Sequence, residues 1–140
     1  MSKSNAFEND LVDLIFNATG IANIASDASS SAATTLTLAL HTGDPGEAGD
    51  MSTNEATYTS YTRKTVARTS SGFTVSGNGV TLASAVSFPA ATGGSETITH
   101  FSVGTGIGNN MLYSGTVTPN IVVSTGVTPQ LTTSTAITED

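Results

Sequence analysis

Apolar side chains near the start of the chain recur with the spacing of a helix. Between residues 5 and 17 they fall at i, i+4, i+7 and i+8, which places them on one helical face. Asn5 is in position to cap the first turn, Glu8 lies three residues later, and Gly20 suits the end of the helix. We therefore predict one amphipathic helix over residues 5–17, docked on its own domain. Its predicted docking face consists of Phe7, Leu11, Leu14 and Ile15.

From residue 34 onward the hydrophobic period changes to two. Leu36, Leu38 and Leu40 alternate with polar or small residues, which is typical of a strand with one buried face. His41 falls on the polar face of this strand. The sequence Gly77-Asn78-Gly79 is a hairpin signal between two further strands. Strands rich in Thr, Val, Tyr and Phe are predicted at residues 57–68, 72–76, 79–83, 85–88, 96–104, 111–117, 121–124 and 130–138.

This succession of short strands predicts the fold class. The strands are separated by Gly, Pro and Asn, and no second helical pattern follows the first, so a parallel sheet with crossover helices is disfavoured. We predict a mainly β fold, in which an antiparallel β-sandwich or barrel-like arrangement over residues 34–138 carries one N-terminal helix. No linker or internal repeat divides the chain, so residues 1–140 are expected to form a single domain.

Composition excludes several classes of function. Four basic and eleven acidic side chains give a net charge of −7, which argues against nucleic acid as a partner. The chain has no cysteine, and therefore no thiol nucleophile, disulfide or thiolate metal site. Its apolar stretches are far shorter than the roughly 18 residues of a membrane span. Acidic residues rather than an apolar region follow Lys3, so neither a signal peptide nor a membrane partner is expected.

Few residues carry the chemistry that catalysis or metal binding needs. The two histidines, His41 and His100, lie in predicted strands, and no serine has an activating context, so we interpret both histidines as structural. Asp44, Glu47 and Asp50 share one loop, but the loop lacks the ligand ladder of an EF-hand. A solvated turn is therefore favoured over a calcium site. We predict a protein that is not an enzyme, without catalytic, cofactor or metal sites.

One basic cluster stands out in this acidic chain, on the strand predicted at residues 57–68. Two interpretations remain open. The cluster can contact an acidic surface of another subunit, or it can protect an exposed edge of the sheet against unwanted pairing. The candidate subunit-contact residues are Tyr61, Arg63, Lys64 and Arg68.

Several short motifs in a fixed order resemble a family of small virion proteins of tailed phages, often labelled phage tail fibre proteins. The resemblance extends over nearly the whole chain, from the N-terminal helix to the acidic segment Ile137-Thr-Glu-Asp. The motifs that carry it are Leu36-Thr-Leu-Ala-Leu-His-Thr-Gly-Asp44-Pro-Gly-Glu-Ala-Gly, Tyr61-Thr-Arg63, Ser87-Phe88-Pro89-Ala, Ile98-Thr-His100-Phe and Leu112-Tyr113-Ser-Gly115.

The resemblance implies a structural part of a bacteriophage particle and brings no catalytic residues with it. A fibre shaft usually needs heptads or repeats, and the chain has neither. We therefore expect a capsid decoration or cement protein that stabilises the head by binding the major capsid protein at the capsid surface. The alternative is a tail-tip or tail-fibre-associated protein involved in host attachment. Contact with other virion subunits and a homo-oligomer are expected, with a trimer favoured and a dimer as the alternative.

Overall fold

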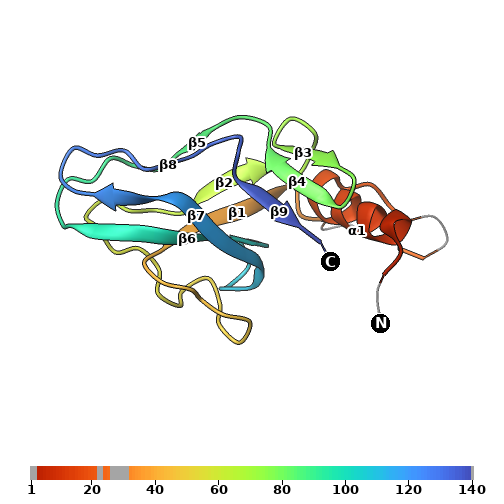
Figure 1. Cartoon of the computed structure of the whole chain (residues 1–140), viewed down its shortest axis with the longest axis horizontal. Coiled ribbons are helices and arrows are strands. Elements are labelled where there is room, and N and C mark those ends of the chain that lie inside the picture. Colours follow the sequence, from red (N-terminus) through yellow and green to blue (C-terminus); the bar gives the residue numbers. More distant parts are fainter. Residues whose placement is uncertain (1–2, 22–23, 26–31, 140) are drawn as a thin grey trace.

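The computed structural model describes residues 3–21, 24–25 and 32–139, and it confirms the mainly β fold with one N-terminal helix (Figure 1). The strand pairs are all antiparallel, and no sheet in this described part of the chain closes into a barrel. The elements are α1 (Asn5–Asn17), β1 (Thr35–His41), β2 (Lys64–Ala67), β3 (Phe73–Ser76), β4 (Gly79–Leu82), β5 (Val86–Ser87), β6 (Glu96–Gly104), β7 (Met111–Val123), β8 (Gln130–Leu131) and β9 (Ala136–Thr138).

Within the described ranges the strands form three sheets, and the paired strands are often distant in sequence. The largest has the order β2-β1-β6-β7, so the central pair β1 and β6 joins segments about half the chain apart. A three-stranded sheet has the order β3-β4-β9, and β5 pairs with β8. The β3–β4 hairpin turns at Gly77, whose φ of 60° is the left-handed conformation that the Gly-Asn-Gly signal predicts.

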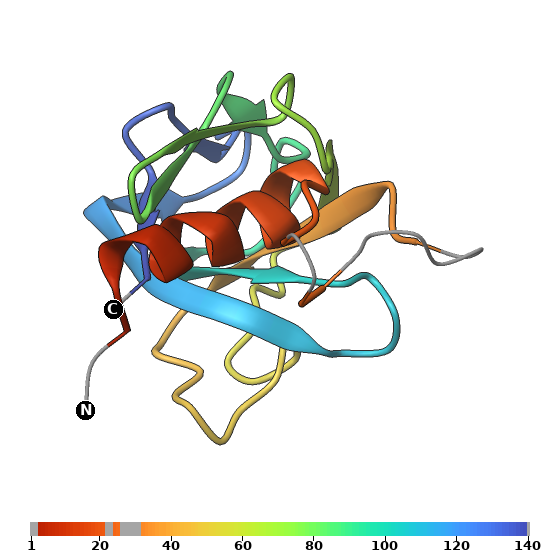
Figure 2. The ribbon, with the colours of Figure 1, turned by 90° about the vertical axis from the view of Figure 1, so that its right-hand side faces the viewer.

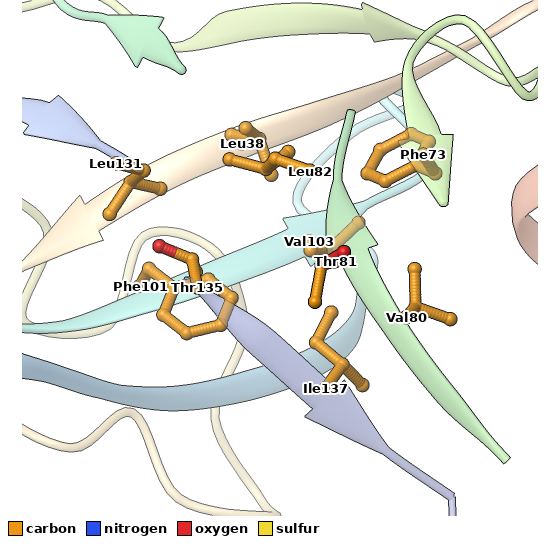
Figure 3. Close-up of a pocket in the computed structure, with 10 residues that line it drawn as sticks. All are labelled: Leu38, Phe73, Val80, Thr81, Leu82, Phe101, Val103, Leu131, Thr135 and Ile137. Atoms are coloured by element: carbon orange, nitrogen blue, oxygen red, sulfur yellow. The ribbon is translucent and has the colours of Figure 1, made fainter. Parts of the chain in front are cut away.

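The main core lies between the four-stranded sheet on one side and α1 with the β3-β4-β9 sheet on the other. Leu38 of β1, Phe101 of β6 and Leu82 of β4 are all nearly inaccessible to solvent. Figure 3 shows such side chains from both layers pointing toward one another around a small apolar cavity. The cavity has a volume of about 10 Å³, which is at most the space of one water molecule. The layers are therefore closely packed and leave no room for a ligand between them.

Strand β1 is buried on both faces, which corrects the prediction of one buried and one polar face. Its leucines face the main core, while Ala39 and His41 on the opposite face are also fully buried. Residues 42–57 cover that opposite face, and Figure 2 shows this yellow segment on the side of the sheet away from the helix. Fully buried Met51 belongs to the cover, and a Cβ atom built on Gly104 would lie 2.1 Å from its sulfur. Gly104 therefore provides the space that the cover needs.

The helix spans residues 5–17 as predicted, but its caps lie one and two residues before the predicted ones. Ser4, rather than Asn5, is the N-cap, and its side chain accepts a hydrogen bond of 3.3 Å from the Phe7 backbone N–H. At the other end Ala18 adopts the left-handed conformation with φ of 57°, so the helix stops before Gly20 is reached. Short polar side chains are good N-caps in general, which is why neighbouring Ser4 and Asn5 could not be ranked by residue type.

The buried face of α1 is centred on residues beside the predicted one. Val12 and Phe16 are fully buried, whereas Phe7 of the predicted face is 38% exposed. The Phe16 ring packs edge-on against Phe73 at 5.0 Å and lies 5.6 Å from the Tyr113 ring. Apolar residues cover a wide arc of this helix. The part of the arc that docks is the part that carries Phe16, because this ring packs against the rings of Phe73 and Tyr113. Leu11, Leu14 and Ile15 flank the buried centre and are half-buried.

Several strand boundaries also differ from the predictions. Residues 57–63 lie outside the named strands, since Tyr61 N–H donates to the Tyr58 carbonyl in a turn and Ser60 has a positive φ of 84°. The carboxylate of Glu96 accepts from the backbone N–H groups of Thr57 and Tyr58 at 3.1 to 3.2 Å, and so holds the chain out of the sheet. The predicted segments 111–117 and 121–124 form one strand, β7, and the predicted segment 130–138 is divided by a turn into β8 and β9.

Substitution of the buried helix ring tests how far the fold depends on helix docking. Phe16→Ala is expected to lower the free energy of unfolding by roughly 3 to 5 kcal/mol, as for other fully buried phenylalanines. Phe7→Ala, a matched control on the partly exposed side of the same helix, is expected to cost much less. Urea unfolding of the purified variants measures both values, and equal losses would contradict docking through Phe16.

Candidate interaction surface

Arg68, a predicted subunit-contact residue, is instead buried against the end of α1. Its Nε donates to the Ile15 carbonyl oxygen at 2.6 Å, its Nη2 donates to the Leu14 carbonyl, and its Nη1 donates to the Ala33 carbonyl at 3.1 Å. The last carbonyls of a helix lack partners within the helix and carry the negative end of its dipole, so a guanidinium is a favourable cap. Arg68 therefore fastens α1 to the residues that follow β2.

Arg63 and Tyr61 are brought together, as predicted, but they are directed at the chain's own atoms. Arg63 donates from Nε and Nη2 to the two Glu55 carboxylate oxygens, both at 2.7 Å, and from Nη2 to the Asn109 side chain at 3.0 Å. The Tyr61 hydroxyl donates to Glu55 at 3.1 Å and accepts from the Leu40 N–H at 3.0 Å. The hydrogen bond to Glu55 raises the pKa of Arg63, and burial raises the pKa of Tyr61. The network joins the cover over β1 to the connection between β6 and β7.

Lys64, the fourth predicted subunit-contact residue, lies at the start of β2, an edge strand of the main sheet. The position agrees with protection of a sheet edge, one of the two roles that the sequence left open for the basic cluster. The four residues consequently do not form one basic surface. Arg68 lies beneath the helix, while Arg63 and Tyr61 face Glu55.

His41 is a buried structural group rather than a residue on a polar face. Its Nδ1 lies 2.8 Å from the Thr53 carbonyl oxygen and its Nε2 lies 2.7 Å from the Ser102 hydroxyl. A carbonyl only accepts, so Nδ1 carries the proton and Nε2 accepts from Ser102. Burial lowers the pKa of His41, which favours this neutral form. His41 and Ser102 are both inaccessible to solvent, so a substrate has no access to this Ser–His pair.

The carboxylates of the loop after β1 are used in local turns. Asp44 Oδ1 accepts from the Gly46 N–H at 2.8 Å, and Asp50 Oδ1 accepts from the Ser52 N–H and hydroxyl at 2.8 and 2.6 Å. The hydrogen bonds from Ser52 lower the pKa of Asp50. Among the residues that the structure describes, no three His, Asp or Glu side chains converge in a way that could hold a metal ion.

Glu139 joins the segment after β9 to Lys3, which precedes α1. The Glu139 carboxylate lies 2.9 Å from the Lys3 ammonium and accepts from the Tyr113 hydroxyl at 2.8 Å, and these contacts lower the pKa of Glu139. The Asn78 side chain donates to the Glu139 carbonyl at 2.8 Å. Figure 1 accordingly shows both chain ends near α1, at one end of the molecule.

Two hollows of the described surface lie along β7. A groove of about 650 Å³ runs between residues 116–122 of this strand and residues 130–136, and none of its lining residues is charged. A second hollow of about 430 Å³ lies at the other end of β7, between residues 111–114 and the loop of Asp44 and Glu47. An uncharged groove therefore lies along the second half of β7, and an acidic hollow lies at its start. We define the β7 edge as residues 111–123 together with the uncharged groove.

No helix in the described ranges is long and apolar enough to span a membrane. The side chains of His41, Arg63 and Arg68 make contacts within the fold. The β7 edge, in contrast, combines a long strand with an open, uncharged groove, and it is the candidate interaction surface of the chain.

Comparison with known proteins gives one family. The family described as podophage GP4 fiber I protein gp80 matches residues 2–138, which includes the helix, all three sheets and the β7 edge. The match confirms the resemblance to phage virion proteins that the sequence motifs indicated. No curated protein matches the chain.

Removal of the Arg68 side chain tests its role beneath the helix. Arg68→Ala is expected to destabilise the fold by roughly 1–3 kcal/mol for each buried carbonyl left without a partner. Arg68→Lys keeps the charge but loses the planar fork, so it should fall between Arg68→Ala and the unchanged protein. Lys64→Ala on the edge of β2 is the control, with an expected change within about 0.5 kcal/mol. Urea unfolding would contradict this role if Arg68→Ala and Lys64→Ala were equally stable.

The lowered pKa of His41 predicts a pH dependence of stability with a definite sign. The unfolded chain binds a proton at His41 near pH 6.5, and the folded chain binds it only at lower pH. Stability from this group is therefore fully present above about pH 6.5 and is lost as the pH falls through the folded pKa. Melting temperatures between pH 5 and 7.5 should decrease toward acid, and His41→Gln should flatten this slope. His100→Gln removes only the smallest of the contributions that act on the pKa of His41 and keeps its burial and its hydrogen bonds, so most of the slope should remain.

Proposed function

The chain belongs to the family of the podophage GP4 fiber I protein gp80, and from this premise we propose that it is a tail-fibre-associated structural protein involved in host attachment. The family match over residues 2–138 is the observation that carries the proposal. It supports a component of the phage particle, and within the particle it favours the tail-fibre alternative over capsid decoration.

The structure supports a role in assembly rather than in chemistry. Histidine, arginine and glutamate side chains that catalysis would need are engaged in internal contacts, as at His41, Arg63 and Glu55. The single cavity shown in Figure 3 is too small for a substrate. Close packing on both sides of the main sheet instead provides a rigid body, which suits a part that transmits or fixes the position of its neighbours.

The architecture also restricts which part of a fibre the chain forms. Shafts are usually built from heptads or repeats, whereas the described residues of this chain form one short helix and sheets of two to four strands. We propose a compact module at an end or junction of the fibre, in contact with other virion subunits. In this role its surface, rather than an internal site, does the binding.

Locating the protein in intact particles tests the proposal. Fab fragments raised against the purified chain and bound to particles are expected to appear at the tail in electron micrographs. Quantitative mass spectrometry should find a copy number far below that of the major capsid protein. Fab density distributed over the capsid lattice, with copy numbers approaching the number of lattice sites, would instead establish the decoration role.

Particles that lack the protein give a second, functional readout. They are expected to retain packaged DNA on heating as well as complete particles do, but to adsorb to host cells more slowly. Adding back the purified chain should restore adsorption, which controls for indirect damage to the particle. Loss of heat resistance with normal adsorption would contradict a fibre role.

A further inference from the structure

The first half of β7 has an edge that no other strand of the described chain covers. The strand order places β7 at the margin of the main sheet, and within the described ranges its only strand partner is β6. The pairing is regular between residues 113–116 of β7 and residues 100–103 of β6, and it is shifted on both sides of this stretch. Every second residue of an edge strand directs its N–H and C=O away from the sheet. Two of the residues 113–116 therefore offer a donor and an acceptor each to an added strand.

The two edges of the main sheet differ in their protection against an added strand. The opposite edge strand, β2, has only four residues and contains Lys64, and a lysine on an edge opposes pairing with another strand. In contrast, β7 contains no charged residue, and its single proline, Pro119, lies outside residues 113–116. The register shift beside Leu112 limits an added strand to a few paired residues, but Leu112 itself is 40% exposed and available for contact.

Carboxylates lie beside the start of β7, on the side of the main sheet that residues 42–57 cover. Asp44 and Glu47 line the hollow of about 430 Å³ together with residues 111–114. Asp50 lines a further hollow of about 650 Å³ at the start of the same strand. The exposed Glu47 side chain makes no hydrogen bond or ion pair within the described part of the chain. A strand added along residues 113–116 therefore passes beside negative charge.

The basic side chains of the chain do not neutralise these carboxylates. Arg63 lies close enough to Asp50 for the two charges to interact, but its guanidinium is paired with both carboxylate oxygens of Glu55. The other basic side chains lie elsewhere in the fold: Lys3 at Glu139, Lys64 on β2 and Arg68 beneath the helix. The charge beside the open edge is thus left to be balanced by a partner.

Charge complementarity identifies the strand that this edge suits. A second copy of the chain has a net charge of −7, and its β7 contains no cation, so it does not balance the carboxylates. A segment in which lysine or arginine alternates with apolar residues does. Alternate side chains of a strand point to the same face, so its cations can lie on the face of exposed Ser114 and the acidic hollow. Its apolar side chains then lie on the face of half-buried Tyr113.

We propose that residues 113–116 of β7 accept an extended segment of another protein as an added strand, and that Asp44 and Glu47 select a segment with alternating basic and apolar side chains. The added strand extends the main sheet beyond β7. Backbone pairing supplies the attachment, and the carboxylates supply the selectivity. The inference goes beyond the proposed function, because it names the chemistry of a partner and is tested on the purified chain, wherever that chain lies in the particle.

Three short peptides separate strand pairing from attraction by charge alone. A fluorescent peptide of alternating lysine and valine is expected to bind the purified chain in anisotropy measurements, and to bind more weakly as salt is raised. Replacing every lysine by glutamate reverses the charge, and methylating every backbone nitrogen keeps the charge but removes the donors. Both changes should weaken binding by roughly tenfold or more. Failure of the lysine–valine peptide to bind, or equal binding of all three peptides, would overturn the proposal.

Charge reversal on the protein tests where the peptide binds. Glu47→Lys changes an exposed side chain without internal partners and should weaken binding of the lysine–valine peptide roughly three- to tenfold. Asp10→Lys makes the same change in net charge on the exposed side of α1 and should leave the affinity nearly unchanged. Equal losses in the two variants would contradict selection by the acidic hollow.

Hydrogen exchange locates the added strand on the backbone. Bound lysine–valine peptide is expected to slow exchange of the outward amides within residues 113–116, while exchange on the opposite edge strand β2 stays unchanged. Binding that left the exchange rates of residues 113–116 unaltered would overturn strand addition at this edge, even if the peptide bound tightly.

Discussion

Burial of β1 on both faces is the constraint on which most of the remaining structure depends. Side chains of successive residues point to opposite sides, so both sides of the sheet need a cover. The helix and the β3-β4-β9 sheet supply one, and residues 42–57 supply the other (Figure 2). A buried imidazole must keep its hydrogen bonds. His41 forms one with Thr53, in the segment of residues 42–57, and one with Ser102, in β6. The polar contacts thus fix the position of a cover that apolar contacts alone would not specify.

Internal use of the few basic residues explains the character of the surface. Lys3 pairs with Glu139, Arg63 with Glu55, and Arg68 with carbonyls at the helix end. These contacts engage three of the four basic side chains within the chain itself. The charge that remains on the described surface is therefore mainly acidic.

Local patterns sufficed for the fold class but not for the faces and the site. The hairpin at Gly77 and the strand period from Leu36 were readable because turn chemistry and alternation are local signals. The predicted docking face of α1 was displaced from the observed one by part of a helical turn. Which of the apolar residues becomes buried depends on the Phe73 and Tyr113 rings, which lie far along the chain. Likewise, the sequence shows that Arg63 and Arg68 are near each other, but not that a helix end and Glu55 already engage them. The β7 edge was hidden because Pro119 divided its pattern into two predicted strands.

The hairpin of β3 and β4 has a consequence for the order in which the chain becomes structured during synthesis. The helix α1 leaves the ribosome before the strands, but a helix of 13 residues is marginal in water on its own. Its docking partner Phe73 is translated more than 50 residues later, and β9, which completes the same sheet, is later still. The helix therefore has to wait for its docking partner, and the domain cannot complete its folding until β9 has been synthesised.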